Sequence, residues 1–190
     1  MIVLPESVTP NEIYRLLTAC VIPRPIAWVT TLAEDGTINA APFSFFNAVS
    51  SDPPIVMISV ERRMGEPKDT ARNIHTSREF VVNIVNEQLA EKMNTTAGNY
   101  PRTTSEIELA GLSLLPGVKL RTPRIGESPI SLECSVLQWT ELGKGPTDLI
   151  FGEVLSFHIR DDVFAGGKMN FKELKAIGRL AGNTYCRTTD

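Results

Sequence analysis

Apolar positions along the chain occur mostly in short runs that are rich in β-branched and aromatic residues, a pattern typical of β-strands. These runs predict strands at about 26–32, 37–45, 55–60, 80–85, 130–141 and 149–160. The glycines and proline of residues 143–148 mark a reversal, so the last two strands are expected to form a β-hairpin. Helical patterns lie between the strands, at about 10–19, 69–75, 87–93, 106–109 and 171–177. Because strands and helices do not alternate regularly, the pattern favours a closed or split antiparallel barrel over a doubly wound sheet.

Some segments carry more specific expectations. Thr9-Pro10-Asn11-Glu12 combines a capping Thr, a Pro in the first turn and a Glu three residues after the cap, which predicts a helix start. Pro42 predicts a bulge or an edge position for its strand. The run 55–60 lacks polar alternation until its end, so we expect a central strand that is buried on both faces. Residues 94–128 are expected to be mostly loop and to form either a lid or a dimer contact.

The composition is that of a globular protein with one hydrophobic core. Of the 190 residues, 42% are hydrophobic and 22% are charged, so we expect a single domain over residues 1–190. The net charge of -3 lacks the basic excess typical of nucleic-acid binding, and no signal peptide or membrane-spanning run is visible. Three widely spaced cysteines without a CxxC motif, Cys20, Cys134 and Cys186, argue against a zinc site and fit a reducing cytoplasm. Nucleic acid, a membrane and a bound metal are therefore not expected.

Common catalytic signatures are absent from the sequence. It contains no G-x-G-x-x-G, no P-loop, no H-E-x-x-H and no G-x-S-x-G. His75 falls where a helix is predicted to end and His158 falls inside a predicted strand, so both are expected to be structural. Asp161 and Asp162 are expected to form a solvated turn rather than an acid/base pair. Hydrolysis therefore has no candidate apparatus, and no residue is assigned a catalytic role.

Polar residues gather between two predicted apolar strands and at the helix start that follows them. The predicted loop carries Ser44, Asn47, Ser50 and Ser51. Lys68-Asp69-Thr70 begins a predicted helix, whose N-terminus presents unpaired N–H groups and partial positive charge. Lys68 and the Thr70 hydroxyl would complete a site for a phosphate monoester. The alternative is that Asp69 only caps the helix, that Lys68 is solvated, and that the phenylalanines beside the loop only fill the core.

Four segments of the chain resemble the flavin reductase-like FMN-binding split-barrel family, which includes flavoredoxin and the reductase components of two-component monooxygenases. They are residues 24–31 (RPIAWVTT), 39–47 (NAAPFSFFN), 52–54 (DPP) and 68–74 (KDTARNI), in the order and spacing expected of the family. Gly178-Arg179-Leu180 near a tyrosine also looks like the end of the family's domain. The resemblance implies a mainly β fold, α+β by count, in which helices are inserted into a split antiparallel β-barrel.

The resemblance also implies a homodimer that holds FMN non-covalently near the subunit interface. The FMN phosphate is expected at Lys68, Asp69 and Thr70, with Arg179 as a further contact from the same or the partner subunit. The residues expected near the flavin ring, through side chains or backbone N–H groups, are Trp28, Thr30, Thr31, Ser44, Phe45, Asn47, Ala48, Val49 and Ser50. The implied electron donor is NADH or NADPH, and the implied acceptor is free flavin, a monooxygenase or another partner. An FMN electron carrier without nicotinamide turnover, and a barrel that binds no flavin, are the alternatives.

Overall fold

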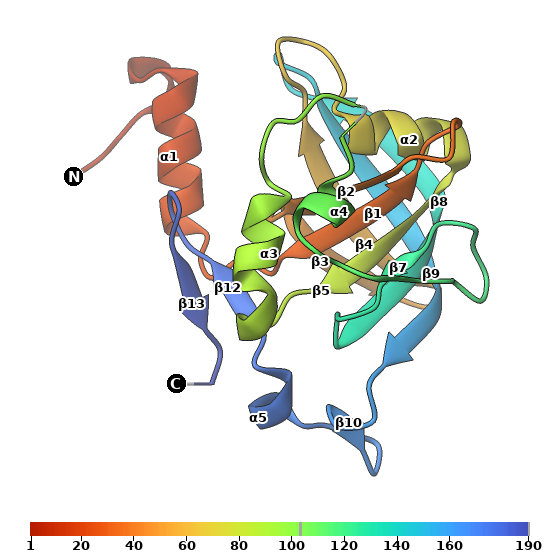
Figure 1. Cartoon of the computed structure of the whole chain (residues 1–190). Helices are drawn as coiled ribbons and strands as arrows, with labels where there is room; N and C mark the ends of the chain where they lie inside the picture. Colours follow the sequence, from red (N-terminus) through yellow and green to blue (C-terminus); the bar gives the residue numbers. More distant parts are fainter. Residues whose placement is uncertain (103, 190) are drawn as a thin grey trace.

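The computed structural model describes residues 1–102 and 104–189, and seven of its strands form one sheet (Figure 1). They are β1 (Ala27–Leu32), β2 (Ile38–Phe43), β3 (Phe46–Ser51), β4 (Pro54–Glu61), β5 (Glu79–Ile84), β8 (Ile130–Leu142) and β9 (Thr147–Ile159). Their order in the sheet is β2-β1-β5-β8-β9-β4-β3, and every neighbouring pair is antiparallel. The predictions of a mainly β protein, of an antiparallel sheet and of the β8–β9 hairpin are confirmed.

Helices and short strand pairs surround this sheet. The helical segments are η1 (Pro5–Ser7), α1 (Pro10–Cys20), α2 (Asp69–Ser77), η2 (Glu87–Leu89), α3 (Ala90–Thr95), α4 (Glu106–Leu109) and α5 (Phe171–Leu174). The short antiparallel pairs are β6 (Leu114–Leu115) with β7 (Arg124–Ile125), β10 (Phe164–Ala165) with β11 (Lys168–Met169), and β12 (Ile177–Arg179) with β13 (Tyr185–Arg187). Helix α1 begins with the predicted capping box between Thr9 and Glu12. It stands apart from the barrel, beside β12 and β13 (Figure 1).

The sheet is curved so that its two edge strands meet. Strands β2 and β3 occupy opposite ends of the strand order, but β2 ends at Phe43 and β3 begins at Phe46. A link of two residues cannot cross a flat sheet of this width, since a residue of extended chain spans only about 3.5 Å. The Ser59 N–H also donates to the Phe45 carbonyl oxygen at 2.8 Å, joining the link to β4. The barrel is therefore closed at the link between β2 and β3.

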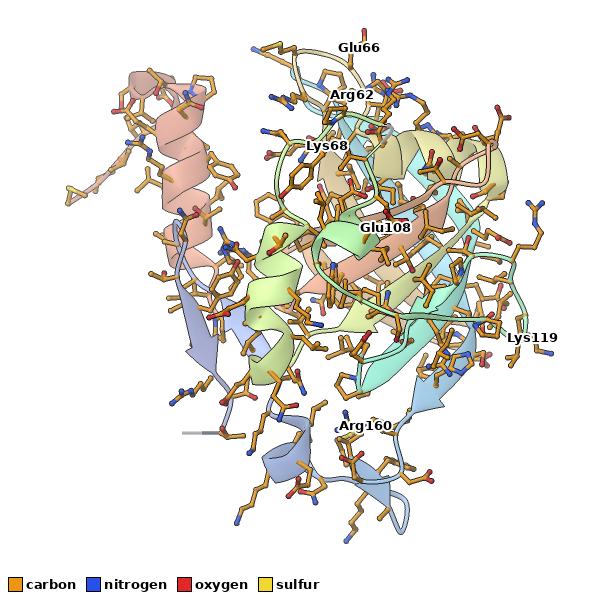
Figure 2. All side chains as sticks on the ribbon, viewed as in Figure 1. Arg62, Glu66, Lys68, Glu108, Lys119 and Arg160 are labelled. Carbon is orange, nitrogen blue, oxygen red and sulfur yellow. The ribbon has the colours of Figure 1, made fainter. Side chains whose placement is uncertain are left out.

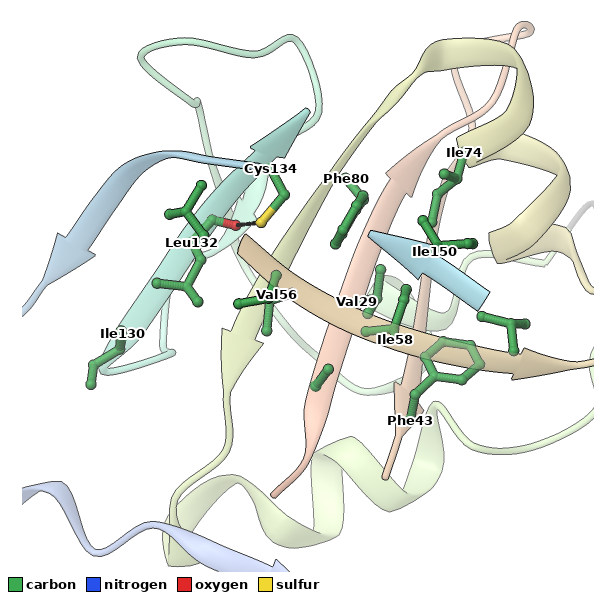
Figure 3. Close-up of a cluster of buried hydrophobic side chains, with 14 of the residues drawn as sticks. Val29, Phe43, Val56, Ile58, Ile74, Phe80, Ile130, Leu132, Cys134 and Ile150 are labelled. Atoms are coloured by element: carbon green, nitrogen blue, oxygen red, sulfur yellow. Dashed lines mark hydrogen bonds between the residues drawn. The ribbon is translucent and has the colours of Figure 1, made fainter. Parts of the chain in front are cut away.

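Alternate residues of the strands supply two hydrophobic clusters. The larger cluster lies inside the barrel, where Val29 and Phe80 pack with Ile58, and Ile74 of α2 covers one end (Figure 3). A second cluster lies on the other face of β1, where the fully buried Trp28 packs among residues of α3, α4 and β7. Neighbouring residues of β1 thus point to opposite faces, as strand geometry requires. Helices α3 and α4 are held against the outside of β1 and β2.

Two predictions about the strands are wrong. Strand β4, expected at the centre, lies between β9 and the edge strand β3, and its burial alternates because only one of its faces lines the core. Residues 46–51, expected as loop, form β3, which pairs with β4 only, so exposed polar positions gave no strand signal. The edge position predicted for Pro42 is confirmed, since β2 ends the sheet. No helix within the described residues combines the length and apolar character needed to cross a membrane.

Candidate functional site

Two adjoining cavities open beside β2 and the first turn of α2. The α1-side cavity has a volume of about 310 Å³ and is bordered by residues of α1, β2, β4 and β12. The α2-side cavity has a volume of about 420 Å³ and is bordered by β2, α2 and residues 96–102. Pro42, Phe43, Lys68 and Ala97 line both cavities, so the two form one elongated groove. Part of the excursion 94–128 therefore supplies one wall of this groove.

Lys68 lies where the two cavities meet, on the side of the barrel that faces α1 (Figure 2). It is the N-cap residue of α2, and Asp69 is the first residue of the helix rather than its cap. The Lys68 side chain forms no capping hydrogen bond, so within residues 1–102 and 104–189 the N–H groups of the first turn have no side-chain cap. The Lys68 ammonium lies 5.8 Å from the centroid of the Phe43 ring, and among the described residues it forms no ion pair. The Lys68 ammonium and the N–H groups of the first turn of α2 thus lie together at the groove.

Thr70 places a hydroxyl at the wall of the α2-side cavity. Its side chain is buried, and its Oγ1 accepts a hydrogen bond of 3.0 Å from Asn39 Nδ2. Both residues line the cavity, so β2 and α2 each contribute a polar group there. The Asn39 amide fixes the position of the hydroxyl oxygen but leaves its proton free to donate to a ligand.

Asp69 connects the loop wall of the groove to the helix. Its carboxylate accepts a hydrogen bond from Arg72 and forms an ion pair with Arg102, whose Nε lies 3.0 Å away. Arg72 also donates to the Pro67 carbonyl oxygen at 2.8 Å. These contacts connect Pro67, before Lys68, and Arg102, in the loop wall, to the first turn of α2.

Glu106 adds a carboxyl group to the α2-side cavity. Burial raises the pKa of Glu106 above its ordinary value, and the nearby negative charge of Asp69 adds to this effect, while the Ala40 N–H opposes it with a hydrogen bond of 3.3 Å. The Glu106 carboxylate in this cavity therefore takes up a proton more readily than a glutamate exposed to water does.

The α1-side cavity is aromatic and carries a second cation. Its wall includes Tyr14 and Phe45, whose ring centroids are 6.3 Å apart. Arg179 and Tyr185 also line it, and Arg179 Nη1 donates to the Tyr185 hydroxyl oxygen at 2.6 Å. Ser44 lies in the same wall, at the link between β2 and β3. An elongated ligand with a planar aromatic end and an anionic end matches this distribution of groups.

Three predicted ring contacts, Trp28, Thr30 and Thr31, are buried and line neither cavity. Trp28 Nε1 donates to the Thr96 hydroxyl at 2.9 Å, so it supports a residue of the α2-side wall. Thr30 Oγ1 donates to the Pro123 carbonyl oxygen. Of the three, Trp28 thus supports the groove from behind through Thr96, whereas Thr30 bonds outside the groove, and direct contact with a flavin remains a prediction.

Four more predicted contacts, Asn47, Ala48, Val49 and Ser50, lie on the exposed edge strand β3 outside both cavities. Strand β3 follows directly after Ser44 and Phe45, which do line the α1-side cavity. The structure thus brings together Ser44, Phe45, Lys68 and Arg179 in the α1-side cavity and Lys68, Asp69 and Thr70 in the α2-side cavity.

Sequence reasoning did not assign Tyr14, Arg102 and Glu106 to the site. Tyr14 looks like an ordinary position of an amphipathic helix, and the other two lie in a segment without a periodic pattern. Only the fold brings them to β2 and α2, because their contacts span long stretches of the chain.

Comparison with known proteins agrees with this architecture. Residues 19–175 match the family described as flavin reductase like domain. The chain is similar to nitrilotriacetate monooxygenase component B from Bacillus cereus, with 38% identity, a TM-score of 0.97, and coverage of 100% of this chain and 96% of that chain. It is similar to the 2-nitrobenzoate 2-nitroreductase of Pseudomonas fluorescens, with 35% identity, a TM-score of 0.92, and coverage of 100% and 93%.

The fold extends to more distant proteins. A protein with a split barrel domain from Shewanella frigidimarina shares 18% identity and a TM-score of 0.87, with coverage of 100% of this chain and 96% of that chain. The prediction of a split antiparallel barrel is confirmed. The match over residues 19–175 and the similarity to two proteins above 30% identity establish that this chain belongs to the flavin reductase-like family.

Proposed function

We propose that this protein is an FMN-binding oxidoreductase that takes reducing equivalents from NADH or NADPH and passes them to free flavin, a monooxygenase partner or another acceptor. The observation that carries the proposal is the uncapped first turn of α2 at the junction of two cavities, beside Lys68, which has no ion pair in the part of the chain that the structure describes. Membership of the flavin reductase-like family and the similarity to a monooxygenase component and a nitroreductase support the same activity.

The residues of the groove fit FMN. A phosphate dianion at α2 would meet the Lys68 ammonium, the Thr70 hydroxyl and the free N–H groups of the first turn. The negative charge of Asp69 is partly neutralised by Arg72 and Arg102, so it does not leave the phosphate end acidic. The planar ring would then extend along β2 into the α1-side cavity, against Phe45 and Tyr14.

Strand β3 adds backbone donors to the ring end. Because β3 pairs only with β4, the N–H groups along its other side have no partner strand. The pairing register also shifts between Ala48 and Ser50, which marks a β-bulge. We propose that N–H groups of residues 47–50 on this side of β3 bind the polar edge of the flavin ring. For Ala48 this requires release of its present hydrogen bond to Asn47 Oδ1, at 2.9 Å.

The chain's own residues hold and shield the cofactor rather than perform proton chemistry. Bound FMN would supply the hydride and electron transfer, for which no protein acid/base pair is required. Lys68 and Thr70 would fix the phosphate, and the loop wall of residues 96–102 would exclude water from the cofactor's middle. The open side of the α1-side cavity leaves room for a nicotinamide or another partner.

We also propose that the protein is a homodimer in the cytoplasm. Large apolar side chains are exposed on three strands: Val49 on β3, Leu137 and Trp139 on β8, and Leu155 and Phe157 on β9. A second copy of the chain would cover them across a two-fold axis and bring β3 and the ring end close to the interface. The three cysteines are free thiols, as expected in a reducing compartment. A sedimentation equilibrium mass of one chain at micromolar concentration would contradict the dimer.

An absorbance titration tests the proposed function. Purified protein is mixed with FMN under anaerobic conditions, and NADH or NADPH is then added. We expect a perturbed flavin spectrum that bleaches with at least one nucleotide faster than free FMN does. Bound flavin that reacts with dithionite but with neither nucleotide would instead identify an electron carrier, and the absence of binding would overturn the cofactor assignment.

A further inference from the structure

Arg24 is a buried cation directly behind the α1-side cavity. Only 6% of the residue is exposed, and it does not line the cavity itself. Its Nε donates to Ser44 Oγ at 3.3 Å, and Ser44 does line the cavity. Its carbon Cζ also lies 5.9 Å from the centroid of the Phe45 ring. Arg24 therefore contacts two side chains of the cavity wall from the inside.

The remaining donors of Arg24 bind backbone carbonyl groups. Nη1 donates to Thr18 O at 2.6 Å and to Val21 O at 2.8 Å, and Nη2 donates to Leu180 O at 3.0 Å. These carbonyl groups belong to the end of α1 and to the residue after β12. A neutral side chain with fewer donors would leave some of these carbonyl groups without a hydrogen bond. However, none of these partners carries a negative charge that would balance the charge of Arg24.

Arg179 lies directly opposite Arg24. Each of the two residues donates its backbone N–H to the other's carbonyl oxygen, at 3.0 and 2.8 Å, in an antiparallel bridge. Residues opposed in this way point their side chains to the same face. Arg179 lines the α1-side cavity, so the two guanidinium groups lie on the cavity's side of the bridge.

Neither arginine has a carboxylate partner within residues 1–102 and 104–189. Burial lowers the pKa of Arg24 below its ordinary value, and the positive charge of Arg179 lowers it further, against an opposing effect of Tyr14. The guanidinium nevertheless stays charged, because arginine is not deprotonated in proteins. Two positive charges are thus held together at one end of the groove without an anion of the chain to balance them, which is unfavourable for folding alone.

We propose that Arg24, acting with Arg179, is a positioning residue that makes the cavity bind reduced FMN in preference to oxidised FMN. This inference rests on the proposed flavin site. A reduced flavin ring carries negative charge at its N1 and O2 edge, whereas the oxidised ring is neutral there. A fixed positive charge behind Ser44 favours the reduced ring without forming a bond to it, because the charges attract across a partly dehydrated wall.

The test compares the dissociation constants of oxidised FMN and dithionite-reduced FMN for four proteins under anaerobic conditions. These are the wild type, Arg24→Lys, Arg24→Gln and the control Arg15→Met, which removes an exposed cation from α1. Both Arg24 variants lose the guanidinium fork, but only Arg24→Gln loses the charge. We expect Arg24→Gln to lower the preference for reduced FMN about tenfold, which is about 30 mV for a two-electron couple.

The outcomes separate the inference from the proposed function. Arg24→Lys and Arg15→Met are expected to keep the preference of the wild type within about threefold. If Arg24→Gln weakens both forms of FMN equally, Arg24 only supports the structure and the inference is wrong. If Arg24→Gln does not fold, the same measurement is made on Arg179→Gln. Removal of the Arg179 charge must then also lower the preference for reduced FMN, and an unchanged preference would contradict the inference. A wild type that binds neither form would overturn the proposed function instead.

Discussion

Charged side chains are balanced within the chain in one region of the molecule and left without a charged partner in another. On β8, the buried carboxylate of Glu133 accepts hydrogen bonds of 2.8 Å from three consecutive backbone N–H groups, those of residues 118–120, and contacts His158. Lys119 marks this loop, away from the side that faces α1 (Figure 2). In the groove, Lys68 and Arg179 have no carboxylate partner among the described residues, and neither has Arg24 directly behind it. A charge that the chain satisfies stabilises the fold, whereas a charge that it leaves free is available to a ligand.

The largest expected effect concerns Glu133. Glu133→Gln should lower the free energy of unfolding by about 3 to 5 kcal/mol, because it leaves backbone N–H groups and His158 without their charged acceptor. Urea unfolding measures this change. The exposed Glu91→Gln serves as control and should change stability by less than about 0.5 kcal/mol. FMN affinity of the folded Glu133→Gln protein should stay within about twofold, and a larger loss would contradict the separation of the two regions.

Stability at low pH should depend on the same carboxylate. Burial alone raises the pKa of Glu133, but hydrogen bonds from Val118, His158, Lys119 and Leu120 outweigh it and lower the pKa to about 2 from 4.5. The unfolded chain therefore takes up the proton first as the pH falls. A stabilisation of about 3 kcal/mol should be complete above pH 4.5 and lost toward pH 2.

Urea unfolding of the wild type and of Glu133→Gln across this pH range measures that contribution. The difference between the two proteins should shrink as the pH falls. A difference that is constant with pH would mean that Glu133 does not titrate as the hydrogen bonds require.

The smallest expected effect concerns Thr70. Thr70→Val keeps the shape of the side chain but removes the hydroxyl from the α2-side cavity. One hydrogen bond contributes about 0.5 to 1.5 kcal/mol, so FMN affinity should fall about twofold to tenfold. Fluorescence quenching measures the affinity. Thr76→Val, on the same helix but outside the groove, should leave it unchanged, and equal losses in both variants would indicate a general effect on α2.

Local signals in the sequence were sufficient to predict those elements that depend on contacts between residues close together in the chain. The capping box of α1 lies within four residues, and the turn between β8 and β9 is marked by its own glycines and proline. The helix start at Lys68-Asp69-Thr70 was predicted in the same way. These parts of the fold and of the site follow from short-range chemistry.

Long-range contacts could not be predicted in this way. Strand β3 carries mostly exposed residues because it pairs on one side only, so its sequence resembles a polar loop. The role of Arg24 depends on Leu180, which is 156 positions away. The buried Glu133 looks like an ordinary charged residue until the fold brings residues 118–120 to it. Such sites depend on contacts between segments that are distant in the sequence, which a local pattern does not encode.

The most direct test of the central claim compares FMN with riboflavin, which lacks the phosphate. Their dissociation constants are measured for the wild type, for Lys68→Met and for the control Lys144→Met, whose lysine is exposed in the β8–β9 turn. A charge-assisted contact contributes about 1.5 to 3 kcal/mol, so Lys68→Met should weaken FMN about tenfold to a hundredfold and leave riboflavin within about twofold. Equal effects on both ligands, or none on FMN, would show that the phosphate does not bind at the first turn of α2.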